Sequence, residues 1–247
     1  MRRFFVDGEL NGTVAITGPD ARHIGRVLRL GPGAEIMVAD RQGRTGRAAI
    51  TAVTATAVQA EVHELLAADH EPPVSVTLAQ GLPKGDKLEF IVQKAVELGA
   101  AAILPLACDN CTVRYDEAKR GSRRERWQKI AAEAAKQCGR GAVPAVAPIA
   151  SLAEALGATA DGDTAVIMLY EGAGGQPLHD ILAGCAASSY LLLVGPEGGF
   201  SPAEAELCRA RGARIATLGP RILRTETAAL AALSIVLYEK GDLGSGL

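Results

Sequence analysis

Hydrophobic residues follow two different patterns along this 247-residue chain. In residues 1–70, short runs alternate apolar with polar positions or are rich in β-branched residues, and Gly-Pro, Pro-Asp and Gln-Gly pairs separate them. Such runs predict strands joined by turns, so we expect a small sheet or barrel here. The stretch DARHIGRVLRL (20–30) is an exception, because its apolar spacing predicts a short helix with Asp20 as a candidate N-cap.

From Val74 onward, predicted strands and helices alternate. Near-continuous apolar runs predict strands that are buried on both faces, and they lie at 74–80, 101–106, 163–170, 190–194 and 213–218. Apolar residues at helical spacing predict helices at 86–99, where Gly99 is the expected stop, at 122–139 and at 226–241. Ser122 with Glu125, and Ser151 with Glu154, have the spacing of capping boxes.

The alternation of strands and helices predicts an α/β domain with a mostly parallel sheet. We place this domain at 74–247 and the smaller β domain at 1–70. DHEPP (69–73) is the expected linker, because two adjacent prolines do not continue a sheet.

Composition narrows the classes of function. The chain is 48% hydrophobic and 22% charged with a net charge of −2, so a nucleic-acid partner would have to meet a local basic patch. No apolar run approaches the roughly 20 residues that span a bilayer, and the N-terminus has no signal-peptide pattern, so we expect a cytoplasmic protein with no membrane association. Cys108 and Cys111 form a C-x-x-C, but without a second ligand pair we expect reduced structural cysteines and no metal.

Three glycine- or proline-rich loops follow predicted strands, and ligands bind at such carboxyl ends in α/β sheets. They are VIMLYEGAGG (166–175), LLLVGPEGGFS (191–201) and TLGPRILRTETA (217–228). In the second loop, Gly198 and Gly199 allow close approach of a ligand, and Ser201, Pro202 and Glu204 predict a helix start. A tight turn without a ligand is the alternative.

The usual nucleotide motifs are absent from these loops. The second loop lacks the Gly-Lys-Ser/Thr element of a phosphate-binding loop, and GAGGQP has Pro177 where the last glycine of the dinucleotide fingerprint belongs. In the third loop, Arg221 and Arg224 precede a helix that Thr225 or Thr227 would cap. Arginines oppose the dipole at a helix start, so they indicate a nearby anion or RNA phosphate, or else solvated loop residues.

The paired motifs LLLVGPEGGFS and LGPRILRTETA, followed by an Ala/Leu-rich last helix, resemble the RsmE family. These are S-adenosylmethionine-dependent methyltransferases of the SPOUT class that modify ring nitrogen 3 of a uridine in small-subunit (16S) ribosomal RNA. The resemblance covers nearly the whole chain, including RRFFV (2–6) and KGDKLEFIVQKAVELG (84–99). ACDNCTVRY (107–115) departs from it, since relatives carry a Glu-Arg-Ser-like stretch there.

The resemblance implies a SPOUT α/β trefoil-knot domain behind an N-terminal PUA-like β-barrel that binds RNA. It implies a homodimer through the last helix, with the assembled small ribosomal subunit as the expected partner. It also implies that the three loops wrap S-adenosylmethionine through Leu169, Tyr170, Glu171, Gly195, Pro196, Glu197, Gly198, Gly199, Leu218, Gly219, Ile222, Leu223, Arg224 and Thr225.

Methyl transfer to uracil assigns further roles. The base must be unpaired or flipped out, and its N3 proton must leave. Arg224 is the candidate to stabilise the resulting negative charge, and Glu226 or Glu197 is the candidate proton acceptor. The RNA-binding candidates lie in two stretches of local positive charge: Arg2, Arg3, Arg22, His23, Arg26 and Arg29 in the first, and Arg114, Arg123 and Arg124 in the second.

Two other functions stay open from the sequence. One is a non-catalytic RNA-binding or ribosome-assembly factor that keeps the fold; three intact cofactor loops argue against it. The other is a nucleotide-dependent α/β enzyme such as an oxidoreductase. Saturable binding of S-adenosylmethionine separates the methyltransferase from the RNA-binding factor, and a ligand screen by thermal shift would reveal a nucleotide-dependent enzyme.

Overall fold

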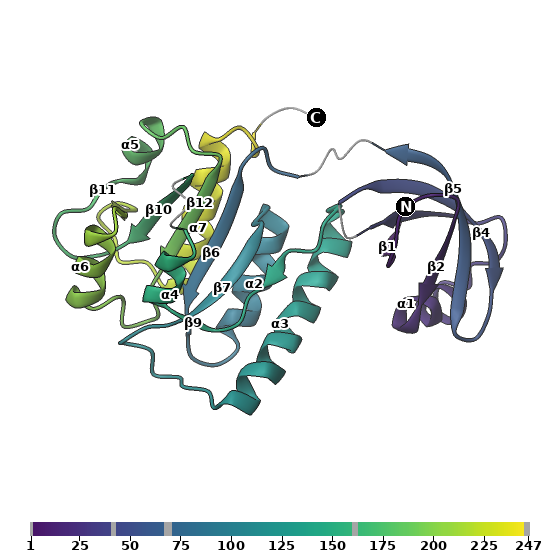
Figure 1. Cartoon of the computed structure of the whole chain (residues 1–247), viewed down its shortest axis with the longest axis horizontal. Helices are drawn as coiled ribbons and strands as arrows, with labels where there is room; N and C mark the ends of the chain where they lie inside the picture. The colour runs from purple at the N-terminus through teal and green to yellow at the C-terminus, as the bar shows by residue number, and fades with distance from the viewer. Residues whose placement is uncertain (1, 41–42, 67–70, 160–162, 245–247) are drawn as a thin grey trace. The chain divides into compact units, whose positions relative to one another are not determined.

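A computed structural model describes residues 2–40, 43–66, 71–159 and 163–244, and they form two compact units. One unit comprises Met1–Glu71 with Ala132–Val143, and the other comprises Pro72–Ala131 with Pro144–Leu247. Figure 1 labels the elements of both units. The expected linker lies partly outside the described residues, and residues 132–143 join a unit to which the sequence-based division does not assign them.

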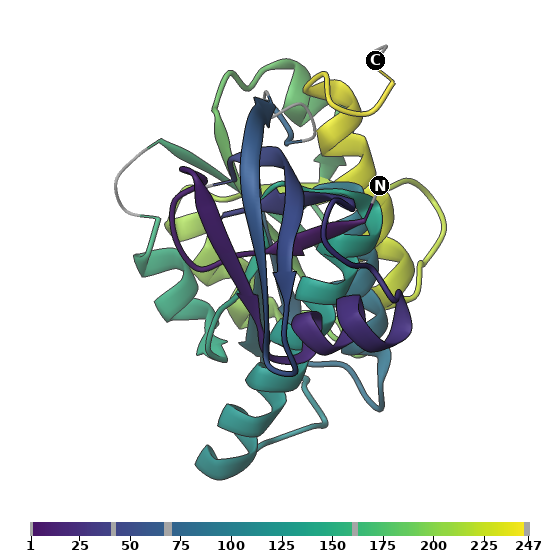
Figure 2. The same ribbon diagram turned by 90° about the vertical axis from the view of Figure 1, so that its right-hand side faces the viewer.

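The N-terminal unit is built on a five-stranded sheet in the order β1-β3-β4-β5-β2. β1 runs parallel to β3, and the remaining neighbours are antiparallel. Irregularities of pairing between β4 and β5 accompany the curl visible in Figure 2. The predicted β domain is confirmed, with strands β1 (Arg3–Phe5), β2 (Thr13–Thr17), β3 (Glu35–Ala39), β4 (Thr45–Val53) and β5 (Ala57–Leu66).

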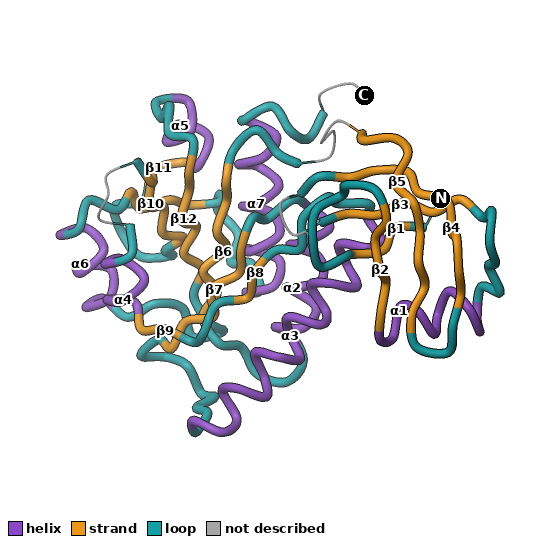
Figure 3. The backbone as a smooth tube through the Cα atoms, turned by 45° about the vertical axis from the view of Figure 1, so that its right-hand side comes forward, coloured by secondary structure: helices purple, strands orange, loops and turns teal. Residues whose placement is uncertain are grey.

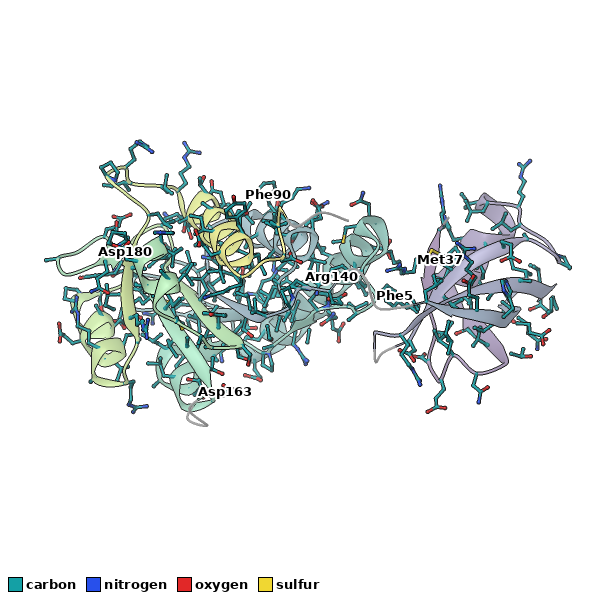
Figure 4. The ribbon with its side chains drawn as sticks, turned by 90° about the horizontal axis from the view of Figure 1, so that it is seen from above. Phe5, Met37, Phe90, Arg140, Asp163 and Asp180 are labelled. Carbon is teal, nitrogen blue, oxygen red and sulfur yellow. The ribbon has the colours of Figure 1, made fainter. Side chains whose placement is uncertain are left out.

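Alternating residues of these strands make the core of the unit. Ile16, Ile36, Val38, Ile50 and Val58 are almost fully buried. Except for the buried Ala39, their neighbours along each strand are more exposed, as the period of two requires for a sheet that is covered on one face. Figure 4 labels the half-buried Phe5 and Met37 on the two parallel strands β1 and β3.

The predicted helix of this unit is present but begins earlier than Asp20. It consists of α1 (Gly18–Arg22) and a π-helical turn, η1 (His23–Val27), and its N-cap is Thr17. Asp20 as N-cap is wrong, because it lies inside the first turn of α1. Both oxygens of its carboxylate accept hydrogen bonds from Lys136 at 2.9 Å. That ion pair helps attach residues 132–143 to the unit.

A second ionic contact fixes the same segment. The carboxylate of Glu71 accepts hydrogen bonds from the guanidinium of Arg140, at 2.5 Å for Nη2, and from the backbone N–H groups of Gly141 and Ala142. Figure 4 labels Arg140, whose side chain is only 6% exposed. These partners are about 70 residues apart, so no local pattern in the sequence reveals the attachment.

The C-terminal unit is a parallel α/β structure, as predicted. Its sheet has the order β11-β13-β10-β12-β6-β7-β8, with β9 beside β7, and every pairing is parallel. Figure 3 shows the strands of this sheet in orange. The strands are β6 (Ser75–Gly81), β7 (Ala102–Ala107), β8 (Ala145–Val146), β9 (Ala150–Ser151), β10 (Thr164–Leu169), β11 (Gln176–Pro177), β12 (Ser189–Val194) and β13 (Arg214–Thr217).

The helices of the sequence prediction are present, with one more short helix, α5 (Leu178–Ala183). The predicted caps at Ser151 and Ser201 are confirmed, since each hydroxyl accepts a hydrogen bond from the third helical N–H and each box glutamate bonds back. The helices are α2 (Lys87–Leu98), α3 (Glu117–Cys138), α4 (Leu152–Gly157), α5 (Leu178–Ala183), α6 (Pro202–Ala210) and α7 (Thr225–Glu239).

The capping box at Ser122 is wrong, because α3 already begins at Glu117. Asp116 accepts the hydrogen bond of the Lys119 N–H at 2.9 Å and so caps the helix nearly two turns earlier. Ser122 lies inside the helix and donates to the Lys119 carbonyl at 3.1 Å. Of the described helices, none is both long and apolar enough to cross a membrane.

The predicted helix stop at Gly99 is confirmed and supports a stability prediction. Gly99 has φ +108, and a Cβ there would lie 2.8 Å from Pro72 Cγ and 3.3 Å from Leu237 Cδ1. We expect Gly99→Ala to lower the free energy of unfolding by about 2–3 kcal/mol, measured in urea. Gly212→Ala is the control: φ is +79 and the space is open, so it should cost only about 1 kcal/mol. Equal losses would contradict the steric argument.

Candidate cofactor pocket

A cavity of about 640 Å³ opens where β10, β12 and β13 end. β10 lies between the other two strands in the sheet, so the loops that follow all three meet at one edge. Every residue that the resemblance assigns to the cofactor lines this cavity. The cavity wall also includes Arg221, which the sequence analysis singled out as a possible anion contact, and residues that it did not single out: Lys87, Val194, Phe200, Ala216, Thr217, Pro220 and Ala228.

The glycine turn between β12 and α6 is packed from two sides. A Cβ on Gly81, at the end of β6, would lie 2.6 Å from Pro196, and a Cβ on Gly198 would lie 3.0 Å from Asn110 Cβ. Gly199 has φ +65 with open space around it. Gly199 therefore supplies the backbone freedom expected of this turn, whereas the absence of a side chain at Gly198 makes room for a neighbouring residue of the protein.

A buried hydrogen-bond network connects this turn to the last helix. The Thr225 hydroxyl donates to the Gly195 carbonyl at 2.6 Å, and the Gln80 amide donates to Thr225 Oγ1 at 2.8 Å and to the same carbonyl at 3.2 Å. Thr225 and Thr227 as caps of α7 are therefore wrong: the N-cap residue is Arg224, and no side chain caps the helix. Gln80 is fully buried; the sequence offers no signal for its role.

Lys87 connects two of the candidate carboxylates. Its Nζ lies 3.0 Å from Glu197 Oε1 and 3.3 Å from Glu226 Oε2. The hydrogen bond to Glu197, opposed by slight burial and aided by Glu226, raises the pKa of Lys87. The Lys84 N–H also donates to Glu197, at 3.1 Å. Burial would raise the pKa of Glu197, but backbone hydrogen bonds and Lys87 outweigh it and hold this pKa below its ordinary value.

The third loop presents exposed side chains at the cavity. Arg221, Ile222 and Arg224 line the cavity, and Ile222 is 82% exposed. Glu226, in the first turn of α7, does not line the cavity and reaches it only through Lys87. The structure thus brings Arg224, Glu197 and Lys87 together at the wall and places Glu226 behind Lys87.

Cys108 and Cys111 form a closed turn after β7. The Cys108 N–H donates to Cys111 Sγ at 3.3 Å, and the Cys111 N–H donates to the Cys108 carbonyl at 3.1 Å. Hydrogen bonding from Cys108 lowers the pKa of the Cys111 thiol to about 7, while the pKa of Cys108 is raised. Within the described ranges no cluster of three or more metal-ligating side chains is present.

The candidate RNA-binding residues fall into two sets. In the N-terminal unit Arg22, Arg26 and Arg29 are exposed, Arg2 bonds His23 at 2.7 Å, and the buried Arg3 donates to the Gly139 carbonyl. Burial lowers the pKa of Arg3, and the fold uses this side chain internally.

The second set lies before and within α3. Arg114 and Arg124 are exposed, although Arg124 Nε also donates to the Val146 carbonyl at 2.9 Å. Arg123 is half-buried: it lies 3.5 Å from Glu89 and over the ring of Tyr115 at 5.6 Å.

Comparison with known proteins identifies the class of protein that this fold and pocket define. Residues 70–237 match the model of an RNA methyltransferase domain, and residues 16–62 match that of an RNA methyltransferase PUA domain. The solved structures that resemble the chain include a methyltransferase E of Neisseria gonorrhoeae with bound S-adenosylmethionine, at 33% identity, a TM-score of 0.85 and coverage of 98% of this chain and 99% of that one. A putative methyltransferase of Legionella pneumophila, also solved with this cofactor, has 31% identity, a TM-score of 0.83 and coverage of 95% and 96%.

Among curated proteins, ribosomal RNA small subunit methyltransferase E of Bacillus subtilis is 38% identical over 97% of both chains. The chain belongs to this RsmE family, and the resemblance inferred from its motifs is confirmed.

Proposed function

We propose that the protein transfers a methyl group from S-adenosylmethionine to ring nitrogen 3 of a uridine in small-subunit ribosomal RNA. The observation that carries the proposal is the cavity itself: three loops from neighbouring parallel strands form it, and all residues assigned to the cofactor line it. Its volume of about 640 Å³ lies in the range of about 300–1,000 Å³ that is typical of small-molecule sites.

The pocket residues fit this cofactor. Glycine and proline backbone at 195–199 and 218–220 offers N–H and carbonyl groups to an adenosyl moiety, while Leu169, Leu218 and Leu223 supply apolar wall. Glu171, an exposed carboxylate on the wall, favours the positively charged part of a ligand. When bound, S-adenosylmethionine supplies an electrophilic methyl group on a cationic sulfur.

The protein's own residues must then handle a base that becomes negatively charged. N3 of uracil is blocked by pairing, so the base has to be unpaired or flipped into the pocket. Arg224 and Lys87 stabilise the negative charge that spreads onto the carbonyl oxygens when the N3 proton leaves to water. Glu197 and Glu226 as proton acceptors are less well supported, because both are engaged with Lys87; we assign them to holding Lys87 in position.

Each of the two domains has its own role in the proposed function. Residues 1–70, PUA-like, bind RNA, and residues 74–247 form the SPOUT knot domain that carries out methyl transfer. Family membership supports a knot and a homodimer. Two exposed aromatic residues support a subunit interface at α2 and α7, which are in contact with each other. They are Phe90 on α2 (Figure 4), which is 47% exposed, and Tyr238 on α7, which is 65% exposed. Sedimentation of the purified protein measures the subunit number. We propose that the protein acts in the cytoplasm on assembled small subunits, in keeping with a substrate in small-subunit ribosomal RNA.

Electrostatic attraction should dominate RNA affinity. We expect the logarithm of the binding constant to fall linearly with the logarithm of salt concentration, with a slope proportional to the number of phosphates contacted. Replacing Arg22, Arg26 and Arg29 together by Ala should make the slope shallower by about 2–3, measured by fluorescence anisotropy on a small-subunit RNA fragment. Replacing Arg209 and Arg211, which lie outside the candidate set, is the control. An unchanged slope in the triple variant would remove these residues from the RNA contact.

The test of the function is a methylation assay. Purified protein is incubated with S-adenosylmethionine carrying a labelled methyl group and with small subunits, or their naked RNA, from cells that lack the gene. Mass spectrometry then locates the label. One uridine labelled at N3 is the expected result; cofactor binding without transfer to either acceptor would point to another acceptor. Neither binding nor transfer would favour the non-catalytic RNA-binding factor.

A further inference from the structure

The turn after β7 is bonded to the glycine turn of the pocket. The Asn110 side-chain amide donates to the Gly198 carbonyl at 3.0 Å and to the Gly199 carbonyl at 3.3 Å. The Ser201 hydroxyl donates to Asp109 Oδ2 at 2.6 Å. These bonds come from a strand that is separated from β12 by β6 in the sheet, so they reach across a whole strand.

The backbone of the same turn is fixed at both ends. The Asp109 N–H donates to Glu204 Oε1 at 3.0 Å, and Oε2 of this buried carboxylate accepts the Ser201 N–H at 2.8 Å. The hydrogen bonds between Cys108 and Cys111 close the turn from below. Asp109 and Asn110 therefore project from a rigid support and not from a free loop.

The fit between Asn110 and the glycine turn is close. A Cβ at Gly198 would lie 3.0 Å from Asn110 Cβ and 3.4 Å from its carbonyl oxygen. Both carbonyls that Asn110 binds belong to residues of the cavity wall. Their orientation sets which backbone groups of the turn point into the cavity, since each peptide plane rotates as a unit.

We propose that Asp109 and Asn110 are positioning residues for the cofactor: they hold the glycine turn in the conformation that binds S-adenosylmethionine. The inference rests on the proposed function. When a site binds its ligand through backbone groups, its affinity depends on the contacts that hold the backbone in the binding conformation. Glycine residues can adopt many other conformations, so without these contacts the turn would have to be ordered on binding. The two residues touch the turn, not the ligand, so their effect belongs in cofactor affinity.

Asn110→Asp is the sharpest variant, because it keeps the size and replaces the donating NH2 group by a carboxylate oxygen that faces two carbonyls. We expect it to raise the Kd of S-adenosylmethionine, measured by isothermal titration calorimetry, by about tenfold or more, and Asn110→Ala by about fivefold. Asp109→Ala should weaken binding by a similar factor, and Asp109→Asn should restore most of it, since its amide oxygen still accepts from Ser201. Thr112→Ala, an exposed position on the same segment, is the control.

The kinetics separate positioning from chemistry. At saturating cofactor we expect kcat of every variant to stay within about twofold of wild type, while KM for the cofactor rises with Kd. If wild type binds the cofactor and Asn110→Asp, Asn110→Ala and Asp109→Ala bind it equally well, the inference is wrong. If wild type does not bind it, the proposed function fails instead. Should Asn110→Asp not fold, by circular dichroism, the pair Asp109→Ala and Asp109→Asn decides.

Discussion

Arg224→Ala should lower kcat for methyl transfer by about 100–1,000-fold while the Kd of S-adenosylmethionine changes by less than about threefold. Arg224 is exposed at the cavity wall. Its cationic guanidinium lies at the N-terminus of α7, where it opposes the helix dipole. A positive charge at such a position can stabilise a base that becomes an anion only during the reaction. Loss of one such donor lowers kcat by about 100–1,000-fold. Single-turnover kinetics on small subunits measure the change.

Two further variants sharpen this test. Arg224→Lys keeps the charge but not the planar fork of donors, so we expect partial recovery. Arg211→Ala removes an exposed arginine at the end of α6, outside the cavity wall, and should leave kcat unchanged. Turnover by Arg224→Ala at the wild-type rate would remove Arg224 from the chemistry and leave the negative charge of the base to Lys87 alone.

The cavity could be anticipated from the sequence because each of its loops is continuous. Apolar runs predict where β10, β12 and β13 end, and a glycine- or proline-rich loop follows each run. The resemblance then places the cofactor residues on those loops. All of this information lies within a dozen residues of a strand end.

The supports of the cavity could not be anticipated in the same way. Gln80, Lys87 and Asn110 belong to segments at or after β6 and β7, and they reach the glycine turn because β6 is the neighbour of β12 and β7 is the neighbour of β6. The order of parallel strands is set by the packing of the whole unit, and no local period encodes it. Glu71 and Asp20 also contact residues 132–143 through tertiary packing between distant parts of the chain, which leaves no local signal in the sequence.

Lys87→Met should lower kcat by about 100-fold and also destabilise the protein near neutral pH. The substitution removes the cation from the cavity wall and leaves the carboxylates of Glu197 and Glu226 facing each other without it. Lys94→Met is the control: Lys94 lies on the same helix with a similarly exposed side chain and pairs with Glu97 at 2.8 Å, away from the cavity wall. It should leave kcat unchanged. Lys87→Arg should recover part of the loss.

The pH dependence of stability identifies the ion pair as the cause. The folded-state pKa of Glu197 lies below its ordinary value of 4.5, so its contribution to stability is present above pH 4.5 and is lost as pH falls through the depressed pKa. The pKa of Lys87 lies above its ordinary 10.5, so its contribution is present below pH 10.5 and is lost as pH rises through the raised pKa. The difference in Tm between wild type and Lys87→Met should therefore be largest between these limits and shrink below about pH 4.5. A difference that is independent of pH would mean that Lys87 stabilises the pocket by packing and not by charge.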